Sequence, residues 1–483
     1  PDGAAPAGTY TLMTYAANSG AGSLRLFPAH RNATLNVGDT GVTLTVDEGG
    51  IAEGSLVWTG DDSANAWNTA ASNWLYSSAA TTYAENEAVS FDDTGSASPS
   101  VNIAPSAVSP GAVTVNNNAK NYTIGGNAIS GSASLTKMGA GTLTLTGVNT
   151  FTGHIAVNGG TLEAAAATTG NASALGDGSN TITVASGGRL LFTGDRTAGY
   201  HAGAVTVNGG TVTGNGSDLS FASGASLTFD TAPGTVDGAG MWRRRGPGNK
   251  VVVTASASGS TLSVADLNLY DSAPTFDVAD GPSASDLNLA SQVTGASVLT
   301  KRGAGTLTLT GANTYSGGNE LLAGTVSVGA MTGFGTGYIA LKFGCAIEYT
   351  GTGSETRSGT YWFDNGDAVI NVVSPAATLT LWKTSGSHNK PIIKKGAGTL
   401  RYGGLHDSFV NNARGSLRVD GGVLESISSV ANNAGDVTVN AGGTFRLGTT
   451  TGAGGTVPPN CQVWDSGSVT LNAGGTFEQN GMD

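Results

Sequence analysis

The side chains best suited to chemistry gather in one basic stretch, residues 241–250, which reads MWRRRGPGNK. Its candidate contact residues are Trp242, Arg243, Arg244, Arg245 and Lys250. A guanidinium group can bind a carboxylate or a phosphate through two parallel hydrogen bonds, so the stretch is a candidate site for an anionic ligand or for a contact with another subunit. The alternative is an exposed hairpin whose charges only interact with water.

Three acidic pairs are the next candidates, and all lie near the N-terminal aromatic residues: Asp61–Asp62, Glu85 with Glu87, and Asp92–Asp93. Paired carboxylates can hold a metal ion or carry out the acid–base catalysis of polysaccharide-active enzymes. None of the pairs has a recognisable catalytic spacing, the five histidines are scattered, and no nucleophile or phosphate-binding motif is present. We therefore predict no catalytic residue, no metal ligand and no cofactor, and interpret the acidic pairs as polar turn residues.

The two cysteines, Cys345 and Cys461, are 116 residues apart. If about 21 residues form one layer of a stack with a spacing of about 4.8 Å, they would lie roughly 24 Å apart, beyond the ~7 Å limit for a disulfide. We expect no bond between them within one chain. Either each is a buried core residue, or one of them forms an intermolecular disulfide in an oxidising exterior.

The composition indicates which structure must position these residues. Glycine accounts for 76 of 483 residues and charged residues for only 12%, which favours strands and turns over helices. A net charge of −12 argues against nucleic acid as a partner, and no apolar run is long enough for a membrane span. The chain starts with Pro1, so we expect either a processed mature protein or a piece of a longer one.

A short sequence recurs along the chain. TKMGAGTLTLTG at 136–147 returns as TKRGAGTLTLTG at 300–311 and, altered, as KKGAGTLRYGG at 394–404. Aligning each Leu-rich strand with the next Gly-Gly-bounded strand gives spacings of 19, 19, 24, 21 and 32 residues for the pairs Leu143–Leu162, Leu307–Val326, Leu400–Leu424, Leu424–Phe445 and Phe445–Phe477. Such a period, with insertions in polar, glycine-rich stretches, predicts a solenoid with one turn per repeat.

One period divides into three short segments with alternating apolar residues, at 142–146, 149–153 and 154–158. Each can bury one side in a central core while the polar side faces water, and glycine permits the tight corners between them. The sequence thus predicts an all-β fold, a right-handed parallel β-helix with three short strands per coil and insertions in its corner loops.

The motifs LTKxGAGTLTLTGxNTxxG and VNGGTL resemble the autotransporter-associated β-strand repeat, also called the passenger-associated repeat, of bacterial β-helix surface proteins. Residues 56–93 resemble the aromatic segment that opens such a unit, and residues 8–26 resemble strands that close a preceding one. The matching aromatic-segment residues are Trp58, Trp67, Asn73, Trp74 and Phe91. The resemblance implies a secreted, extracellular or cell-surface scaffold and says nothing about activity.

These patterns divide the chain into three expected parts: a β segment at 1–46 that completes or caps a neighbouring β-helix unit, an aromatic-rich opening segment at 47–110, and a solenoid rod at 111–483. Neither end carries the polar cap that usually closes a solenoid. We therefore hypothesise head-to-tail assembly, in which the N-terminal strands of one copy extend the last coil of another. The candidate assembly contacts are Tyr10, Leu12, Tyr15, Leu24, Leu26 and Phe477.

The sequence therefore favours an extracellular structural protein that forms a fibre or surface layer as a homopolymer. Two alternatives stay open at this stage. One is an adhesin or autotransporter passenger whose corner loops bind an extracellular glycan or a host surface. The other is a polysaccharide-active β-helix enzyme, although the sequence itself predicts no enzymatic activity.

Overall fold

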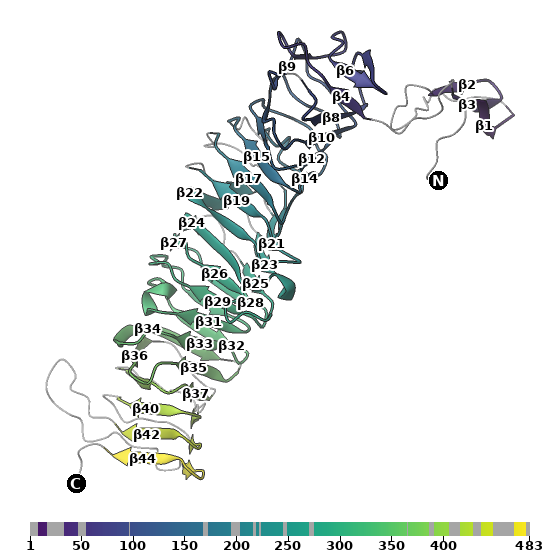
Figure 1. Cartoon of the computed structure of the whole chain (residues 1–483). Helices are drawn as coiled ribbons and strands as arrows, with labels where there is room; N and C mark the ends of the chain where they lie inside the picture. The colour runs from purple at the N-terminus through teal and green to yellow at the C-terminus, as the bar shows by residue number, and fades with distance from the viewer. Residues whose placement is uncertain are drawn as a thin grey trace. The chain divides into compact units, whose positions relative to one another are not determined.

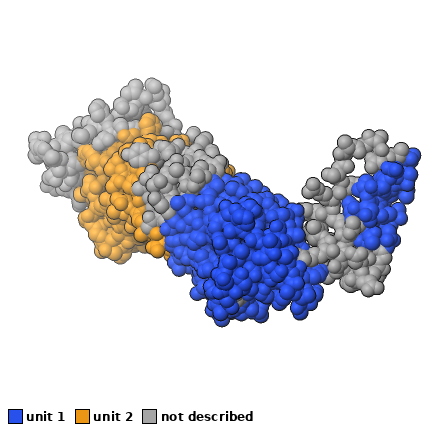
Figure 2. All heavy atoms as spheres, turned by 90° about the horizontal axis from the view of Figure 1, so that it is seen from above, with its two compact units in different colours: residues 1–205 blue, residues 206–483 orange. Residues whose placement is uncertain are grey.

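The computed structural model describes residues 8–16, 33–46, 55–95, 97–167, 172–194, 203–215, 219–221, 224–244, 249–269, 275–364, 366–385, 391–404, 416–427, 436–447 and 468–479. The chain divides into two compact units, residues 1–205 and 206–483 (Figure 2). Within the described residues, the only helical elements are the 3-10 turns η1 (Ala255–Ala257) and η2 (Met331–Phe334). No helix in this part of the chain has the length and apolar character needed to cross a membrane.

Near the N-terminus, three strands form a separate antiparallel sheet in the order β1-β3-β2: β1 (Gly8–Thr14), β2 (Ala33–Val37) and β3 (Gly41–Val46). Pairing places Tyr10 and Leu35 on either side of Leu44, and Met13 opposite Val42. Since opposite residues point to the same face, one face of this sheet is apolar and the other carries threonines. Whether the sheet completes a neighbouring unit stays a prediction.

The opening segment of the first unit folds around buried aromatic rings. Its strands are β4 (Leu56–Trp58), β5 (Ala66–Trp67), β6 (Trp74–Tyr76), β7 (Ala79–Thr81), β8 (Ala88–Asp92) and β9 (Ser100–Ile103). Trp58 and Trp74 meet edge to face with ring centroids 4.9 Å apart, and Trp67 packs against Trp74 at 5.5 Å. Phe91 contacts all three tryptophan rings. Packed, fully buried rings of this size give the first coils a large apolar core.

From β8 onwards the first unit is a stack of coils, each of which adds one strand to each of two parallel ladders (Figure 1). One ladder continues from β8 through β10 (Ala112–Asn116), β12 (Ser134–Met138), β14 (Ile155–Val157) and β16 (Ile182–Ala185). The other continues from β9 through β11 (Tyr122–Gly126), β13 (Thr142–Leu145), β15 (Gly160–Ala164) and β17 (Gly188–Phe192).

The second unit is also a parallel stack, and β18 (Val205–Asn208) contains the boundary between the units. Its first ladder consists of β21 (Ser226–Phe229), β23 (Lys250–Val253), β25 (Thr275–Val278), β28 (Leu299–Arg302), β30 (Asn319–Leu321), β32 (Ile339–Lys342) and the second half of β34 (Ser354–Asp364). Its second ladder consists of β19 (Thr211–Gly214), the first halves of β22 (Thr235–Arg244) and β24 (Ser260–Asn268), β26 (Leu287–Leu289), β29 (Thr306–Leu309), β31 (Thr325–Val328), β33 (Ala346–Tyr349), β35 (Ala368–Val372), β37 (Ile392–Lys395), β39 (Leu417–Val419), β41 (Val437–Val439) and β43 (Val469–Leu471).

A third side of the second unit carries strands in two places. In the first, β20 (Leu219–Phe221) and β27 (Gln292–Thr294) pair with the second halves of β22 and β24. In the second, the first half of β34 starts a ladder that continues through β36 (Thr378–Ser385), β38 (Thr399–Gly404), β40 (Gly422–Ser426), β42 (Gly443–Leu447) and β44 (Thr476–Gln479). Figure 1 shows β40, β42 and β44 stacked one above another.

The predicted all-β parallel solenoid is confirmed, and so is its register. Each of the five predicted alignments is a register pair between neighbouring strands: Leu143–Leu162, Leu307–Val326, Leu400–Leu424, Leu424–Phe445 and Phe445–Phe477. The predicted strand at 149–153 is not a regular strand. Its backbone is joined to the preceding coil by hydrogen bonds from Thr150 and Thr152, and a side-chain amide replaces part of the ladder, as described below.

Candidate functional site

A buried lysine occupies the corner of each of the three recurrent sequences. Lys137, Lys301 and Lys394 are fully buried, and each ammonium donates to three backbone carbonyls. Nζ of Lys137 lies 2.6, 3.0 and 3.2 Å from the carbonyl oxygens of Met138, Gly139 and Gly159. All three N–H groups of the ammonium are therefore satisfied. We call this arrangement the lysine clamp.

The other two lysine clamps reproduce the same geometry. Nζ of Lys301 lies 2.7, 2.7 and 3.2 Å from the carbonyl oxygens of Arg302, Gly303 and Ala323. Nζ of Lys394 lies 2.5, 2.8 and 3.1 Å from those of Lys395, Gly396 and Gly421. In every case two acceptors belong to the corner that follows the lysine and the third belongs to the corner of the next coil. The clamp therefore joins two successive coils.

The corners approach so closely that only glycine fits. Gly139 and Gly160 have φ angles of 70° and 59°, in the left-handed region that other residues rarely adopt. A Cβ on Gly160 would lie 2.3 Å from the carbonyl oxygen of Gly141 and 2.5 Å from that of Gly139. Gly324 and Gly422 would make the equivalent clashes in the other two copies. This backbone contact brings the carbonyl of the later corner within reach of the lysine.

Burial changes the proton affinity of the clamp lysines. Desolvation lowers the pKa of Lys137, Lys301 and Lys394 from 10.5 to about 8. Around Lys301, the nearby Cys345, Asp277 and Asp286 partly oppose this decrease in the pKa. The carbonyl groups favour the protonated form of each lysine over the neutral amine, because each oxygen accepts a hydrogen bond from the ammonium. At pH 7 the clamps are therefore cationic.

An asparagine in each of the first two copies bridges three coils. Oδ1 of Asn149 accepts from the backbone N–H of Ile129 at 2.8 Å, and its Nδ2 donates to the carbonyl of Ala174 at 2.7 Å. Asn313 does the same between Val293 at 2.8 Å and Gly333 at 2.6 Å. These side chains satisfy buried backbone groups where the third side lacks a regular ladder. This is the physical reason why 149–153 differs from the predicted strand.

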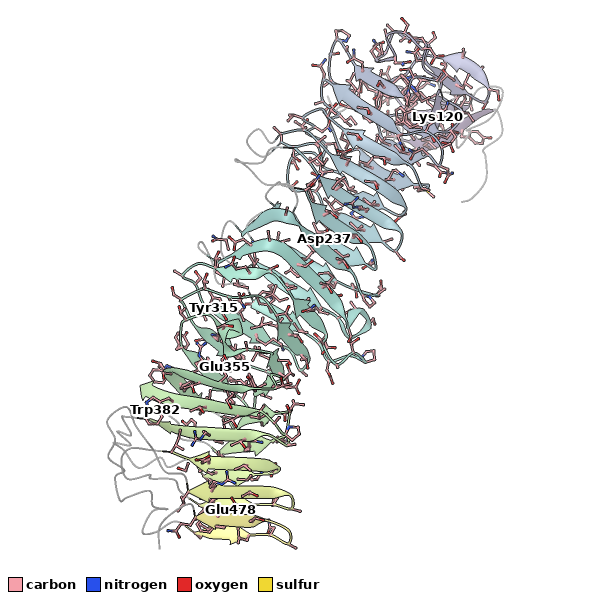
Figure 3. The ribbon with its side chains drawn as sticks, turned by 60° about the vertical axis from the view of Figure 1, so that its left-hand side comes forward. Lys120, Asp237, Tyr315, Glu355, Trp382 and Glu478 are labelled. Carbon is pink, nitrogen blue, oxygen red and sulfur yellow. The ribbon has the colours of Figure 1, made fainter. Side chains whose placement is uncertain are left out.

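Backbone carbonyls also hold a half-buried arginine in the second unit. The guanidinium of Arg357 donates to the carbonyl oxygens of Met331, Gly335 and Gly337, each at 2.8 Å. The backbone N–H of Met331 in turn donates to Glu355 at 2.8 Å. Figure 3 marks Glu355 and the buried Tyr315 in this region. Backbone carbonyls thus hold cationic side chains at more than one place in the solenoid.

The sequence-predicted basic residues do not form a single loop. Trp242, Arg243 and Arg244 lie in β22, and their backbones pair with β20 and β24. Lys250 is exposed at the start of β23, and Arg245 lies outside the described residues. The side chains of Trp242 to Arg244 are also outside the described part, so their proposed ligand or subunit contact stays a prediction.

The acidic pairs bind backbone N–H groups, in agreement with the turn interpretation. Asp93 accepts from the N–H groups of Asn118, Ala119 and Lys120, and these bonds, led by that of Lys120, lower the pKa of its carboxyl. The bonds from Asn65 and Ser63 lower the pKa of the Asp61 carboxyl in the same way. The partners of the remaining carboxylates are backbone N–H groups and hydroxyls of neighbouring turns: Asp62 with Ser98, Asp92 with Thr94, Glu85 with Tyr83 and Ser109, and Glu87 with Ala84.

Cys345 fits the core-residue alternative. Its thiol is free and fully buried, and its single S–H lies within reach of the carbonyl oxygens of Lys342 and Leu321, which are 2.6 and 3.1 Å from Sγ. Burial raises the pKa of this thiol, which reduces its reactivity as a thiolate. Cys461 lies outside the described residues, so a disulfide to another chain stays untested there.

The candidate assembly residues are partly described. Tyr10 and Leu12 lie on β1, and the hydroxyl of Tyr15 donates to the carbonyl of Gly38 at 2.6 Å. Phe477 packs against Phe445 with ring centroids 5.9 Å apart. Leu24 and Leu26 lie outside the described residues. The described contacts are internal to the chain, and assembly through these residues stays a prediction.

Two exposed aromatic side chains were missed at the sequence level. Phe343 is 66% exposed at φ +57°, and Trp362 is 40% exposed on β34 beside the buried Ala340 of β32. The ion pair between Lys342 and Glu320, 3.4 Å long, lies on the same ladder. We call these four residues the Trp362 patch. The alternation of buried and exposed side chains along β34 would have indicated that Trp362 points outward. No signal in the sequence indicates the positive φ angle of Phe343.

Comparisons with known proteins agree with this geometry. Residues 135–164 and 299–328, which contain the first two lysine clamps, match the passenger-associated-transport-repeat family. An alignment of 399 positions, which covers 71% of this chain, is 28% identical to the adhesin BmaC autotransporter of Brucella suis biovar 1 (strain 1330). The chain spans 11% of the length of that relative. No solved structure was found to match the chain. The chain is thus a parallel β-solenoid that carries passenger-associated transport repeats and is similar to an autotransporter adhesin.

Proposed function

We propose that this chain is a solenoid segment of a secreted or cell-surface passenger that serves adhesion rather than catalysis. The observation that carries the proposal is the similarity to an autotransporter adhesin across 71% of the chain, together with two passenger-associated transport repeats. The acidic pairs support the non-enzymatic interpretation, because their carboxylates bind turn N–H groups. Export to the cell surface is part of the same proposal.

The Trp362 patch is the proposed contact surface, and an extracellular glycan is its proposed ligand. An exposed indole offers a flat apolar face against which a sugar ring can stack, with a polar edge at hand. The Glu320–Lys342 pair supplies charged hydrogen-bonding groups on the same ladder. Phe343 adds a second exposed ring, and its backbone strain is of the kind that accumulates at binding sites.

Binding of the purified chain to a glycan array tests this proposal. Trp362→Ala and Phe343→Gly are expected to reduce binding at least tenfold without unfolding the chain. Met138→Ala, which removes another exposed apolar side chain from a different unit, is the matched control and should bind as the unaltered chain does. Equal binding by all variants would contradict the assignment of the patch, and no binding by the unaltered chain would contradict the glycan proposal. Release of sugar products from polysaccharides would contradict the non-enzymatic role.

A fibre or surface-layer role is the second candidate. It is supported by the β1-β3-β2 sheet, whose apolar face includes Met13, 51% exposed, and Val37, 41% exposed. Such a face favours contact with another apolar surface, and a second copy of the chain is the proposed partner. Negative-stain microscopy of the purified chain should then show fibres that disappear when residues 1–46 are deleted. Fibres unaffected by the deletion, or none in the unaltered chain, would contradict assembly through this sheet.

A further inference from the structure

The three lysine clamps share a feature that neither the repeat nor its proposed adhesive role explains. Each buries a cationic side chain completely, and each ammonium donates to three backbone carbonyls. A buried charge is usually stabilised by a charge of opposite sign. Here the hydrogen-bond acceptors are carbonyl oxygens of two glycine corners, and around Lys301 the carboxylates of Asp277 and Asp286 add a Coulombic attraction.

The carbonyl arrangement does not depend on which side of the coil it occupies. Lys301 lies on β28, in the first ladder of the second unit, and the following β29 belongs to the second ladder. Lys394 lies on β37, in the second ladder, and the following β38 belongs to the third side. The clamp of Lys394 therefore lies at the next corner of the coil compared with that of Lys301. Its three Nζ···O distances differ from those of Lys301 by no more than 0.2 Å. The clamp is therefore a property of the corner itself.

We propose that each pair of stacked corners forms a binding site for a primary ammonium ion, a carbonyl cage that the chain fills with its own lysine. We further assign residues 392–426, which the family comparison does not match, as a third repeat of the same kind. The cage consists of the two carbonyls after the lysine and one carbonyl of the next corner. Its selectivity follows from geometry, because three convergent acceptors match the three N–H groups of an ammonium.

The alternative is that the lysine only fills space with its aliphatic stem. Lys301→Ala distinguishes an ammonium site from a space-filling role. The substitution removes Cγ, Cδ, Cε and Nζ and leaves both the carbonyl cage and the space of the aliphatic stem empty. n-Propylammonium has the same three carbons and one nitrogen, and 1-propanol is its neutral counterpart. If the corner is an ammonium site, the cation should bind the variant and stabilise it, and the alcohol should not.

The experiment measures chemical unfolding of the full chain at pH 7 with 100 mM propylammonium chloride, 1-propanol or NaCl. We expect propylammonium to lower the unfolding equilibrium constant of Lys301→Ala about tenfold, the change for a site with a dissociation constant near 10 mM. 1-Propanol and NaCl should have less than a twofold effect. Equal stabilisation by the alcohol, or none by the cation, would overturn the cage. If the variant does not fold, recovery of soluble β structure during refolding with each additive gives the same comparison.

Adjacent lysines provide the matched control for the third repeat. Lys394 is fully buried, whereas Lys395, the next residue, is exposed. Lys394→Ala should respond to propylammonium as Lys301→Ala does, and Lys395→Ala should not respond. A response of both variants would show that the cation acts on the chain in general, and a response of neither would remove residues 392–426 from the repeat. This outcome leaves the adhesive role untouched, since glycan binding is measured on the Trp362 patch.

Discussion

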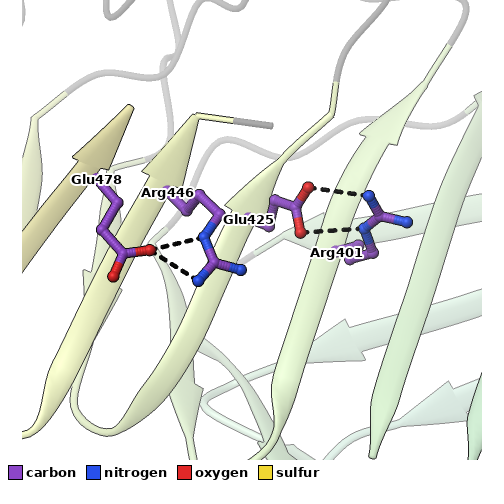
Figure 4. A network of polar contacts seen from close by, with 4 residues as sticks. All are labelled: Arg401, Glu425, Arg446 and Glu478. Atoms are coloured by element: carbon purple, nitrogen blue, oxygen red, sulfur yellow. Dashed lines mark hydrogen bonds and ion pairs between the residues drawn. The ribbon is translucent and has the colours of Figure 1, made fainter. Parts of the chain in front are cut away.

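Arg401 and Glu425 face each other across neighbouring strands of the solenoid, with two parallel hydrogen bonds of 3.1 Å from Nε and 2.9 Å from Nη2 to the carboxylate (Figure 4). Residue Arg446 pairs with Glu425 in register, and it forms an ion pair of 2.7 Å with Glu478 on the following strand. Charges of alternating sign thus follow one row of the third side, one residue per coil.

This row predicts a measurable coupling between Arg401 and Glu425. The Glu425 side chain is only 9% exposed, so solvent screens the pair less than a typical surface ion pair. A double-mutant cycle with Arg401→Ala and Glu425→Ala should give a coupling energy of about 1 kcal/mol in urea unfolding. The exchanged pair, Arg401→Glu with Glu425→Arg, should recover only part of the loss, because it places an arginine beside Arg446 in the same row. A coupling energy near zero would contradict this prediction.

The glycine corners predict a position-dependent cost of adding one methyl group. Gly160→Ala must displace a neighbouring backbone and adopt a positive φ, so it should destabilise the first unit by about 3 kcal/mol or more. Gly187→Ala is the matched control, because Gly187 also has a positive φ, 82°, but its Cβ would meet no atom within 4 Å. It should cost only about 1 kcal/mol. Equal losses of unfolding free energy would show that conformation alone, without the close approach, determines the corner.

The clamp lysines predict that stability rises with pH on the alkaline side. An unfolded lysine titrates near 10.5 and the clamp lysines near 8, so between these values the unfolded chain binds more protons. The free energy of unfolding should therefore increase above pH 8, by up to roughly 1 kcal/mol per pH unit for each lysine. Burial raises the pKa of Tyr122 to about 12, and this opposes the trend above pH 10, where the unfolded tyrosine ionises first.

Guanidinium unfolding between pH 7 and pH 11 checks this prediction. Lys301→Met, which cannot titrate, should reduce the slope between pH 8 and pH 10 by about one third, because one of three similar lysines is removed. Lys395→Met alters an exposed lysine and should leave the slope unchanged. A slope that is zero or negative in the unaltered chain would contradict the lowered lysine pKa values.

Replacing Phe343 by glycine is expected to raise the stability of the chain while it reduces glycan binding. A bulky side chain at φ +57° is strained, and glycine adopts this conformation without a clash. Phe343→Gly should therefore raise the free energy of unfolding by about 0.5–1 kcal/mol, since the exposed ring loses little packing. Phe343→Ala, which keeps the strain but removes the ring, is the control for thermal and urea unfolding. A destabilised glycine variant would show that the ring contributes to packing.

The sequence was sufficient for the architecture because the fold repeats. The alignment of Leu143 with Leu162, and of Phe445 with Phe477 across a 32-residue spacing, predicted the register of strands that the structure pairs. Apolar alternation and glycine corners are local signals, and a stack turns each local signal into a neighbour contact. Phe445 and Phe477 pair in register although 32 residues separate them, so the spacing between two coils can vary while the alternation on the strands keeps the register.

The lysine clamp could not be predicted in the same way. Lys137, Lys301 and Lys394 precede the same Gly-Ala-Gly sequence, which was the available signal, but lysine is normally a surface residue and a pattern of apolar alternation places no cation in a core. Its partners include Gly159, Ala323 and Gly421, whose carbonyls come from the next coil. Only three-dimensional stacking brings them together. The basic stretch at 241–250 attracted attention through its charge, whereas each clamp lysine has at most one basic neighbour in the sequence.

Each lysine clamp points forward along the chain, because the coil that carries the lysine precedes the coil that supplies the third carbonyl. A chain that folds from its N-terminus therefore completes a clamp only after about 20 further residues have been added. Until the next coil is added, the ammonium has only the two carbonyl acceptors of its own corner. At these three corners the most recently added coil would therefore be held less completely than the coil before it.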